Sequence, residues 1–165
     1  MNAELVYITV PVSELDRIRC NDHDDFGNAV VSRTAEGGEP LRCCLTMARA
    51  GDRIALVSHR PMTVGGPYAE VGPVFVHTSE CQAPAPDGFP MDFRDQRAVL
   101  RPYDAAGQML DGVLAEPGAG ETELKRLLTI LRWTRSRSAT WSPAAGTSRC
   151  ADRAELEYFG PLAHY

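Results

Sequence analysis

The sequence predicts an α+β fold, in which a mostly antiparallel sheet carries one main helix on one of its faces. Short segments rich in β-branched residues are separated by turn residues, and strands joined by short turns pair antiparallel. One segment, residues 121–133, has strong helical periodicity. A chain of 165 residues has the length of one ordinary domain, so we expect residues 1–165 to form a single domain.

The N-terminal part predicts one strand and one short helix. Residues 5–10 are apolar and β-branched, which favours a strand, and Ser13 is placed to cap a helix over the next few residues. A polar, glycine-rich stretch follows from Asn21 to Pro40, with a short candidate strand at residues 29–33. Its acidic residues 21–25 lack the spacing of a calcium loop, so we expect a solvated loop there.

The middle of the chain predicts an antiparallel hairpin. Residues 41–47 and 53–59 form its arms, and residues 48–52 form the turn. The second arm is apolar on both faces between Ile54 and Val57, which is typical of a central strand covered on both sides.

The remaining elements follow in order along the chain. We expect a strand at residues 73–78, a proline-rich loop at 82–96, and a second hairpin from 98–103 and 108–114. Four leucines between residues 124 and 131 recur at helical spacing in the main helix. The segment 142–150 is expected to be a loop, and residues 154–158 alternate as a last strand.

Composition excludes several classes of protein. The net charge of −5 disfavours a nucleic-acid partner, because phosphate contacts need a surplus of cations. No apolar run approaches the roughly 18 residues of a membrane helix, and the N-terminus lacks the features of a signal peptide. Five cysteines, an odd number, then indicate reduced thiols in a cytoplasm.

The first hairpin supplies a candidate anion-binding site. If Met47 lies opposite Arg53, alternate residues share a face. The residues that then share one side are Arg42, Cys44, Ser58 and Arg60. Two guanidinium groups would bind a carboxylate and would lower the pKa of the thiol. The alternative is a buried cysteine with two arginines at the sheet edge in surface ion pairs.

The next strand supplies a candidate acid or base. His77 shares a face with Phe75, whereas Val74 and Val76 share the other face and should point into the core. Tyr68 or Glu70 could orient the imidazole, and Cys44 or Cys81 could act as the nucleophile. In the alternative interpretation, Glu70 caps a turn and His77 bonds a backbone carbonyl.

A zinc site is an alternative to these interpretations. The spacing of His77 and Cys81 suits a metal, and Cys43, Cys44 and His59 could complete a tetrahedron. Neighbouring residues of a strand point to opposite faces, however, so only one of the two adjacent cysteines could bind a metal. We therefore expect no metal and no organic cofactor.

Two runs of the sequence resemble a bacterial family of unknown function, domain-of-unknown-function family 1203. These runs are RCCLTMARAGDRIALVSHRP and GPYAEVGPVFVHTSEC. The family features fall on Arg42, Cys44, Leu45, Arg60, Pro61, residues 67–77, Cys81, Tyr103, Asp104, Gly107 and Met109. The family has a cysteine where this chain has Leu41. The resemblance implies a small bacterial cytoplasmic protein and no established reaction.

Together these observations favour an enzyme that acts on a small polar or carboxylated molecule by acid/base or thiol chemistry, since ionisable groups converge on adjacent predicted strands. Arg42, Arg60 and Ser58 would bind the molecule. Two alternatives remain open: a module that binds a small molecule without changing it, and a zinc-stabilised interaction domain.

Overall fold

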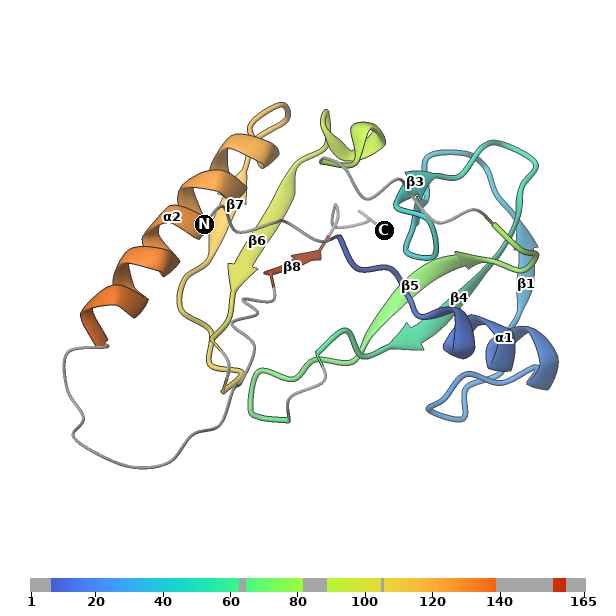
Figure 1. Cartoon of the computed structure of the whole chain (residues 1–165). Helices are drawn as coiled ribbons and strands as arrows, with labels where there is room; N and C mark the ends of the chain where they lie inside the picture. The colour runs from blue at the N-terminus through green and yellow to red at the C-terminus, as the bar shows by residue number, and fades with distance from the viewer. Residues whose placement is uncertain (1–6, 63–64, 82–88, 105, 139–155, 160–165) are drawn as a thin grey trace.

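The chain is an α+β protein, as the sequence predicts. Its computed structural model describes residues 7–62, 65–81, 89–104, 106–138 and 156–159, with side chains up to Thr129 in the long helix (Figure 1). Four predictions lie outside these ranges: the start of the first strand, residues 82–88 of the proline-rich loop, the loop at 142–150 and the start of the last strand.

The described elements are two α-helices, a 3₁₀ turn and eight strands. They are α1 Val12–Asn21, β1 Ser32–Thr34, β2 Pro40–Leu41, β3 Thr46–Met47, β4 Arg53–His59, β5 Gly72–His77, η1 Met91–Phe93, β6 Ala98–Pro102, β7 Val113–Ala115, α2 Gly120–Ser138 and β8 Leu156–Phe159. None of the helices in these ranges is both long and apolar enough to span a bilayer.

The strands form two sheets instead of the one expected. The larger sheet has the order β1-β4-β5-β2-β3, and all its pairs are antiparallel except β2–β5, which is parallel. The smaller sheet, β7-β6-β8, is antiparallel. In Figure 1, α2 lies along β6 and β7, and α1 lies beside β4 and β5.

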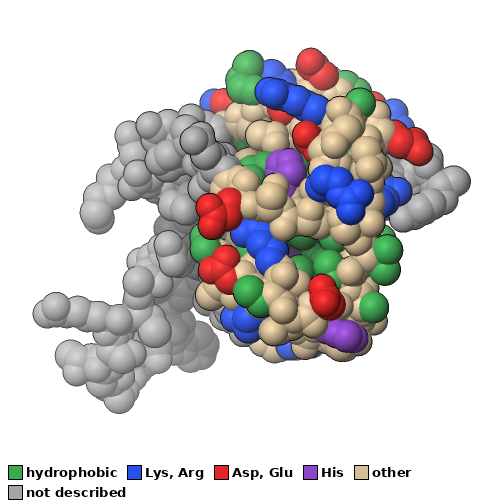
Figure 2. All heavy atoms as spheres, turned by 90° about the vertical axis from the view of Figure 1, so that its right-hand side faces the viewer, with side chains coloured by type: hydrophobic (Ala, Val, Ile, Leu, Met, Phe, Trp, Pro, Cys, Tyr) green, Lys and Arg blue, Asp and Glu red, His purple; other side chains and the backbone are tan. Residues whose placement is uncertain are grey.

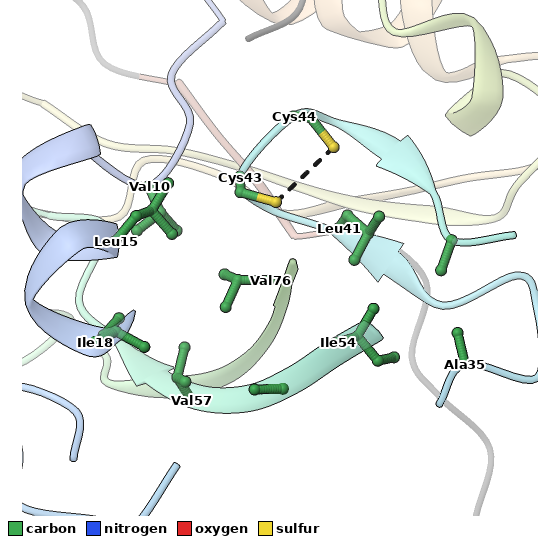
Figure 3. Packing of buried hydrophobic residues seen from close by; sticks show 12 residues of the cluster. Val10, Leu15, Ile18, Ala35, Leu41, Cys43, Cys44, Ile54, Val57 and Val76 are labelled. Atoms are coloured by element: carbon green, nitrogen blue, oxygen red, sulfur yellow. Dashed lines mark hydrogen bonds between the residues drawn. The ribbon is translucent and has the colours of Figure 1, made fainter. Parts of the chain in front are cut away.

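Each sheet has its own hydrophobic core. Leu15 and Ile18 of α1 pack with Val57 and Val76 of the larger sheet (Figure 3). Val76 is buried, as predicted, and Val74 packs against the same cluster. The second core joins α2 to the smaller sheet through a group of buried residues that includes Phe93, Leu100, Leu124 and Leu127. Helical spacing therefore identified correctly the face of the long helix that carries Leu124, Leu127 and Leu128, and the side chain of Leu131 lies outside the described residues.

The predicted first hairpin is wrong. Residues 41–47 do not form one strand, because the chain turns at Arg42–Leu45 and folds β3 back onto β2. The amide of Leu45 donates to the carbonyl of Leu41 at 3.0 Å, and Leu45 has a φ of +54°. β4 pairs with β5 and β1 instead.

The burial pattern gives the reason for this turn. Leu41, Cys43 and Cys44 are buried in the first core, and Leu45 is buried in the second. A regular strand sends alternate side chains to opposite faces, so consecutive residues of one strand would not all reach these two cores. Burial of these side chains offsets the cost of a left-handed residue, about 1–2 kcal/mol.

The N-terminal elements also differ from the prediction. Residues 7–10 are not a strand, although the amide of Val10 donates to the carbonyl of Arg42 at 3.0 Å. Helix α1 begins at Val12, so Ser13 lies inside it and does not cap it. Pro11 precedes the helix, and its carbonyl accepts bonds from the amides of Glu14 and Leu15, both at 3.0 Å.

The second hairpin forms, with Ala98 opposite Ala115, but its second arm is shorter than the predicted 108–114, since β7 covers only Val113–Ala115. Asp104 shapes the connection, because its carboxylate accepts bonds from the amides of Ala106 and Gln108 at 2.9 and 2.8 Å. An aspartate that bonds its own backbone in this way stabilises a turn. The family feature at residues 103–109 therefore has a structural role here.

The acidic stretch after α1 is not simply solvated. Asp24 is buried, and its carboxylate accepts bonds from the amides of Phe26, Asn28 and Ser58 and from the side chain of Asn28. Burial by itself raises the pKa of Asp24, but these hydrogen bonds lower it to about 2. This carboxylate ties the loop to β4.

We expect Asp24 to make stability depend on pH. The pKa of Asp24 is lower in the folded protein than its unfolded value of about 3.9. Its contribution is therefore present above about pH 4 and is lost as pH falls from about 4 to about 2. Asp24→Ala should lower the free energy of unfolding at pH 7 by about 2–3 kcal/mol and should flatten the pH dependence in that window.

Urea denaturation from pH 2 to 7 checks this prediction. Asp25→Ala is the matched control, because Asp25 forms an exposed ion pair with Arg17, and such pairs contribute about 1 kcal/mol or less. Equal losses for the two variants at pH 7 would contradict the structural role of Asp24.

The end of α1 gives a second prediction. Asp22 has a φ of +54° at the helix C-terminus, where a negative charge also opposes the helix dipole. Asp22→Gly should raise the free energy of unfolding by about 0.5–1 kcal/mol, because glycine adopts this conformation without strain. Thermal denaturation measures the change, and a lower melting temperature would refute it.

Candidate metal centre

The turn after β2 brings two adjacent thiols to the end of β5. Cys43 and Cys44 lie side by side on the turn, and their sulfur atoms are 3.9 Å apart (Figure 3). Both sulfurs face the Nδ1 atom of His77, at 3.5 Å from Cys43 and 3.8 Å from Cys44. The prediction that only one of the two adjacent cysteines could bind a metal is wrong, because these residues lie in a turn and not in a strand.

Cys81 completes the group. The ligand atoms of Cys43, Cys44, His77 and Cys81 all lie within 4.8 Å of one another. Within the described part of the chain, no other set of three or more cysteine, histidine or acidic residues converges in this way. Cys43 and Cys44 are buried, whereas His77 and Cys81 are partly exposed. We call these four residues the thiol–imidazole cluster.

The spacing in the cluster matches a tetrahedral metal. With zinc–sulfur and zinc–nitrogen distances of about 2.3 and 2.05 Å, a tetrahedron separates two sulfurs by about 3.8 Å and a sulfur from a nitrogen by about 3.6 Å. The corresponding separations here are 3.9 Å for the sulfurs and 3.5 and 3.8 Å for sulfur and nitrogen. One ion could therefore contact these atoms with small adjustments.

Hydrogen-bond donors surround the sulfurs. The backbone amide of His77 donates to the sulfur of Cys43 at 3.2 Å, and the hydroxyl of Thr46 lies 3.0 Å from the sulfur of Cys44. Donors at these positions stabilise negative sulfur, which is the form that binds metals.

The two adjacent thiols differ in acidity. The hydrogen bond from Cys43, aided by Thr46, lowers the pKa of the Cys44 thiol to about 5 against the opposing effect of burial. The same bond and burial raise the pKa of Cys43. Burial also raises the pKa of Cys81. Of the two turn cysteines, Cys44 is therefore the one whose thiol loses its proton more readily.

Asp52 faces the other side of the imidazole. Its carboxylate lies 3.6 Å from Nε2 of His77, an ion-pair distance. A bond from the amide of Arg49 fixes the carboxylate at 2.8 Å and, together with His77, lowers the pKa of Asp52. A carboxylate behind an imidazole commonly fixes which ring nitrogen binds a metal. Here the arrangement leaves Nδ1 free to face the thiols.

Arg19 supports the cluster from α1. Its guanidinium donates to the carbonyl of Ser79 at 2.7 Å and lies 3.4 Å from that of His77. These contacts hold the chain between His77 and Cys81 against the helix. The positive charge also offsets part of the charge of three thiolates.

The other predicted site residues lie elsewhere. β5 lies between β4 and β2, so Ser58 in β4 and Arg42 after β2 are separated by a strand, about 10 Å. Arg42 stacks over Phe93 at 5.8 Å, and Arg60 stacks over Phe26 at 5.6 Å. The predicted register that would group Arg42, Cys44, Ser58 and Arg60 is therefore absent.

Ser58 has a structural partner. Its amide donates to Asp24, and its hydroxyl accepts a bond from the side chain of Asn28 at 3.0 Å. Similarly, Nδ1 of His59 lies at hydrogen-bond distance, 2.8 Å, from the carboxylate of Glu14 in α1, and His59 does not join the cluster.

Glu70 and Tyr68 do not orient His77. They precede β5, whereas His77 ends it, and six residues of strand span about 16 Å. Glu70 forms an ion pair with Arg101 of β6, and Tyr68 is exposed. Asp52 has the orienting position instead, and the sequence analysis missed it. The local sequence at Gly51 and Asp52 does not indicate that Asp52 lies beside His77, because only the β4–β5 pairing brings the turn to that residue.

A family model described as "Protein of unknown function (DUF1203)" matches residues 38–134. This range contains all four residues of the thiol–imidazole cluster, together with Asp52 and Thr46. No curated protein and no solved structure matches the chain.

Proposed function

The chain belongs to the DUF1203 family of proteins of unknown function, and we propose that it is a zinc-stabilised binding domain. In this proposal the thiol–imidazole cluster binds one zinc ion through three sulfurs and Nδ1 of His77. The supporting observation is the convergence of these four ligand atoms within 4.8 Å of one another, with the separations among Cys43, Cys44 and His77 matching a tetrahedral ion.

Zinc fits this set of ligands better than other common ions. Thiolates and imidazole are soft or intermediate ligands, and calcium and magnesium prefer oxygen. Four protein ligands leave no coordination position open for a substrate, which is typical of a structural zinc site. The ion would join the turn after β2 to the end of β5 and to the residues that follow it.

Burial also favours this proposal over thiol catalysis. The sulfurs of Cys43 and Cys44 belong to residues that are 3% and 4% exposed. An ion needs no open face once it is bound, whereas a substrate must reach the reacting sulfur. The low exposure of Cys43 and Cys44 is therefore typical of a site that encloses a metal ion.

Thiol or acid/base chemistry on a small polar or carboxylated molecule is the second candidate. It is favoured by the contact of the Cys44 sulfur with the imidazole of His77, a pairing that activates nucleophilic cysteines. Cys44 would be the nucleophile, and His77 would accept its proton. This candidate needs no organic cofactor, but it needs an opening to the buried sulfur.

Neither candidate uses a nucleic acid or a membrane as its partner. Basic and acidic side chains are intermixed on the face shown in Figure 2, where a polyanion would need a basic surface.

We place the protein in the reducing cytoplasm of a bacterium, because the described cysteines are all free thiols and metal-binding sulfurs must stay reduced.

Metal content tests the proposal directly. Protein purified without a chelator should contain about one zinc ion per chain by elemental analysis. Cys43→Ser should lower the zinc content, and Cys20→Ser should not, because Cys20 is exposed on α1 outside the cluster. Removal of the metal should lower the melting temperature by about 10 °C, since a loss of several kcal/mol is expected.

Less than about a tenth of an equivalent in the wild-type protein, with no uptake of added zinc, would refute the metal site. Alkylation of Cys44 that is much faster than that of Cys20 would then favour the second candidate. Replacement of zinc by cobalt gives an independent check, because tetrahedral cobalt bound to sulfur absorbs strongly and octahedral cobalt does not.

Asp52 provides a test of the geometry around the metal. Asp52→Asn removes the charge behind His77 and should weaken zinc binding by about 10–100-fold without changing the stoichiometry. Asp111→Asn is the control, because Asp111 lies in the exposed connection before β7. Competition with a chelator of known affinity measures the zinc affinity of each variant. Equal affinities for Asp52→Asn and Asp111→Asn would contradict the role of Asp52.

A further inference from the structure

We propose that the thiol–imidazole cluster is also a site of oxidation, at which a hydroperoxide converts Cys81 and one of the two turn cysteines to a disulfide and thereby expels the metal. This inference rests on the proposed zinc site. It adds a reaction to that site and names the class of molecule that reacts there.

The cluster combines one accessible thiol with two protected ones. Cys81 is partly exposed, and the two residues before it, Ser79 and Glu80, are exposed. Cys43 and Cys44 are buried beneath it. A small oxidant therefore meets Cys81 first, because oxidation of a thiol requires contact between sulfur and the peroxide oxygen.

A second thiol lies within reach of the oxidised one. The four ligand atoms lie within 4.8 Å of one another, so Cys81 needs a movement of about 2–3 Å to reach the bond length of about 2.05 Å with a turn sulfur. A disulfide between Cys43 and Cys44 would close a small ring across a single peptide bond, which is strained. The bond from Cys81 to the turn has no such constraint.

Arg19 favours oxidation at the same place. Its guanidinium anchors the chain at Ser79, two residues before Cys81. This contact keeps the accessible Cys81 close to the buried sulfurs of Cys43 and Cys44, with which it would form the disulfide.

The reaction balances as two displacements. First, the sulfur of Cys81 attacks a peroxide oxygen, so that an S–O bond forms, the O–O bond breaks, and an alcohol or water leaves with a proton. Second, the sulfur of Cys43 or Cys44 attacks the sulfur of the sulfenic acid, an S–S bond forms, and hydroxide leaves as water with a second proton.

The two sulfurs lose two electrons, which reduce the peroxide, and zinc keeps its charge throughout. The metal loses two of its four ligands in this reaction. A tetrahedral site reduced to one thiolate and one imidazole binds zinc far more weakly, so the ion is released. Reduction of the disulfide restores the ligands and hence the binding of zinc.

The test uses the full-length, zinc-loaded protein and hydrogen peroxide. Zinc content is measured first, and release is then followed with a coloured chelator. Tryptic peptides of the product are mapped by mass spectrometry. We expect about one zinc ion released per disulfide formed, and a cross-link between the peptides 43–49 and 54–94. Added thiol reductant and zinc should restore the metal content.

Two variants separate the role of Cys81 from loss of binding. Cys81→His keeps a fourth ligand but removes the accessible thiol, and it should release zinc at least about tenfold more slowly at equal peroxide. Cys20→Ser should behave as the wild type, because this exposed thiol lies outside the cluster.

Several results would overturn the inference. These are retention of zinc at peroxide concentrations that oxidise Cys20, a disulfide contained within the peptide 43–49, and a disulfide that involves Cys20 or Cys150. Zinc-free wild-type protein at the first step would instead refute the metal site itself, and the oxidation mechanism would fall with it. The initial metal measurement therefore distinguishes failure of the site from failure of its oxidation.

Discussion

The tight turn at Arg42–Leu45 is the constraint on which the rest of this structure depends. It reverses the chain between β2 and β3, and it requires a left-handed backbone at Leu45. Burial of Leu41 and both cysteines in one core and of Leu45 in the other stabilises this conformation. The same turn brings two adjacent sulfurs to one side of the chain, where a strand would separate them.

The chemistry of the site follows from where this turn lies. β5 pairs with β2 on one edge and with β4 on the other, so His77 at its end meets the turn on one side and Asp52 on the other. Two sulfurs that share one imidazole in a buried place repel each other when both are charged. A bound cation removes this repulsion, and it is the physical reason to favour a metal over a reactive thiol pair.

The sequence predicted those elements whose formation depends on local periodicity or on turn residues. Helix α2 and the hairpin of β6 and β7 are of this kind, since leucine spacing and the Asp104 turn specify them locally. The hairpin of residues 41–47 and 53–59 failed for the opposite reason. Apolar residues at consecutive positions are compatible with both a buried strand and a buried turn, and contacts distant in sequence decide between them.

The sequence by itself determined the α+β class, the buried face of the long helix, and the presence of thiols and an imidazole at residues 43, 44, 77 and 81. Only the tertiary structure decided that these groups converge, that Asp52 replaces Glu70 beside His77, and that Arg42 and Arg60 lie apart. The reason is that side-chain direction depends on strand register and on a single backbone angle, +54° at Leu45. Both are set by packing between segments that are remote in the chain.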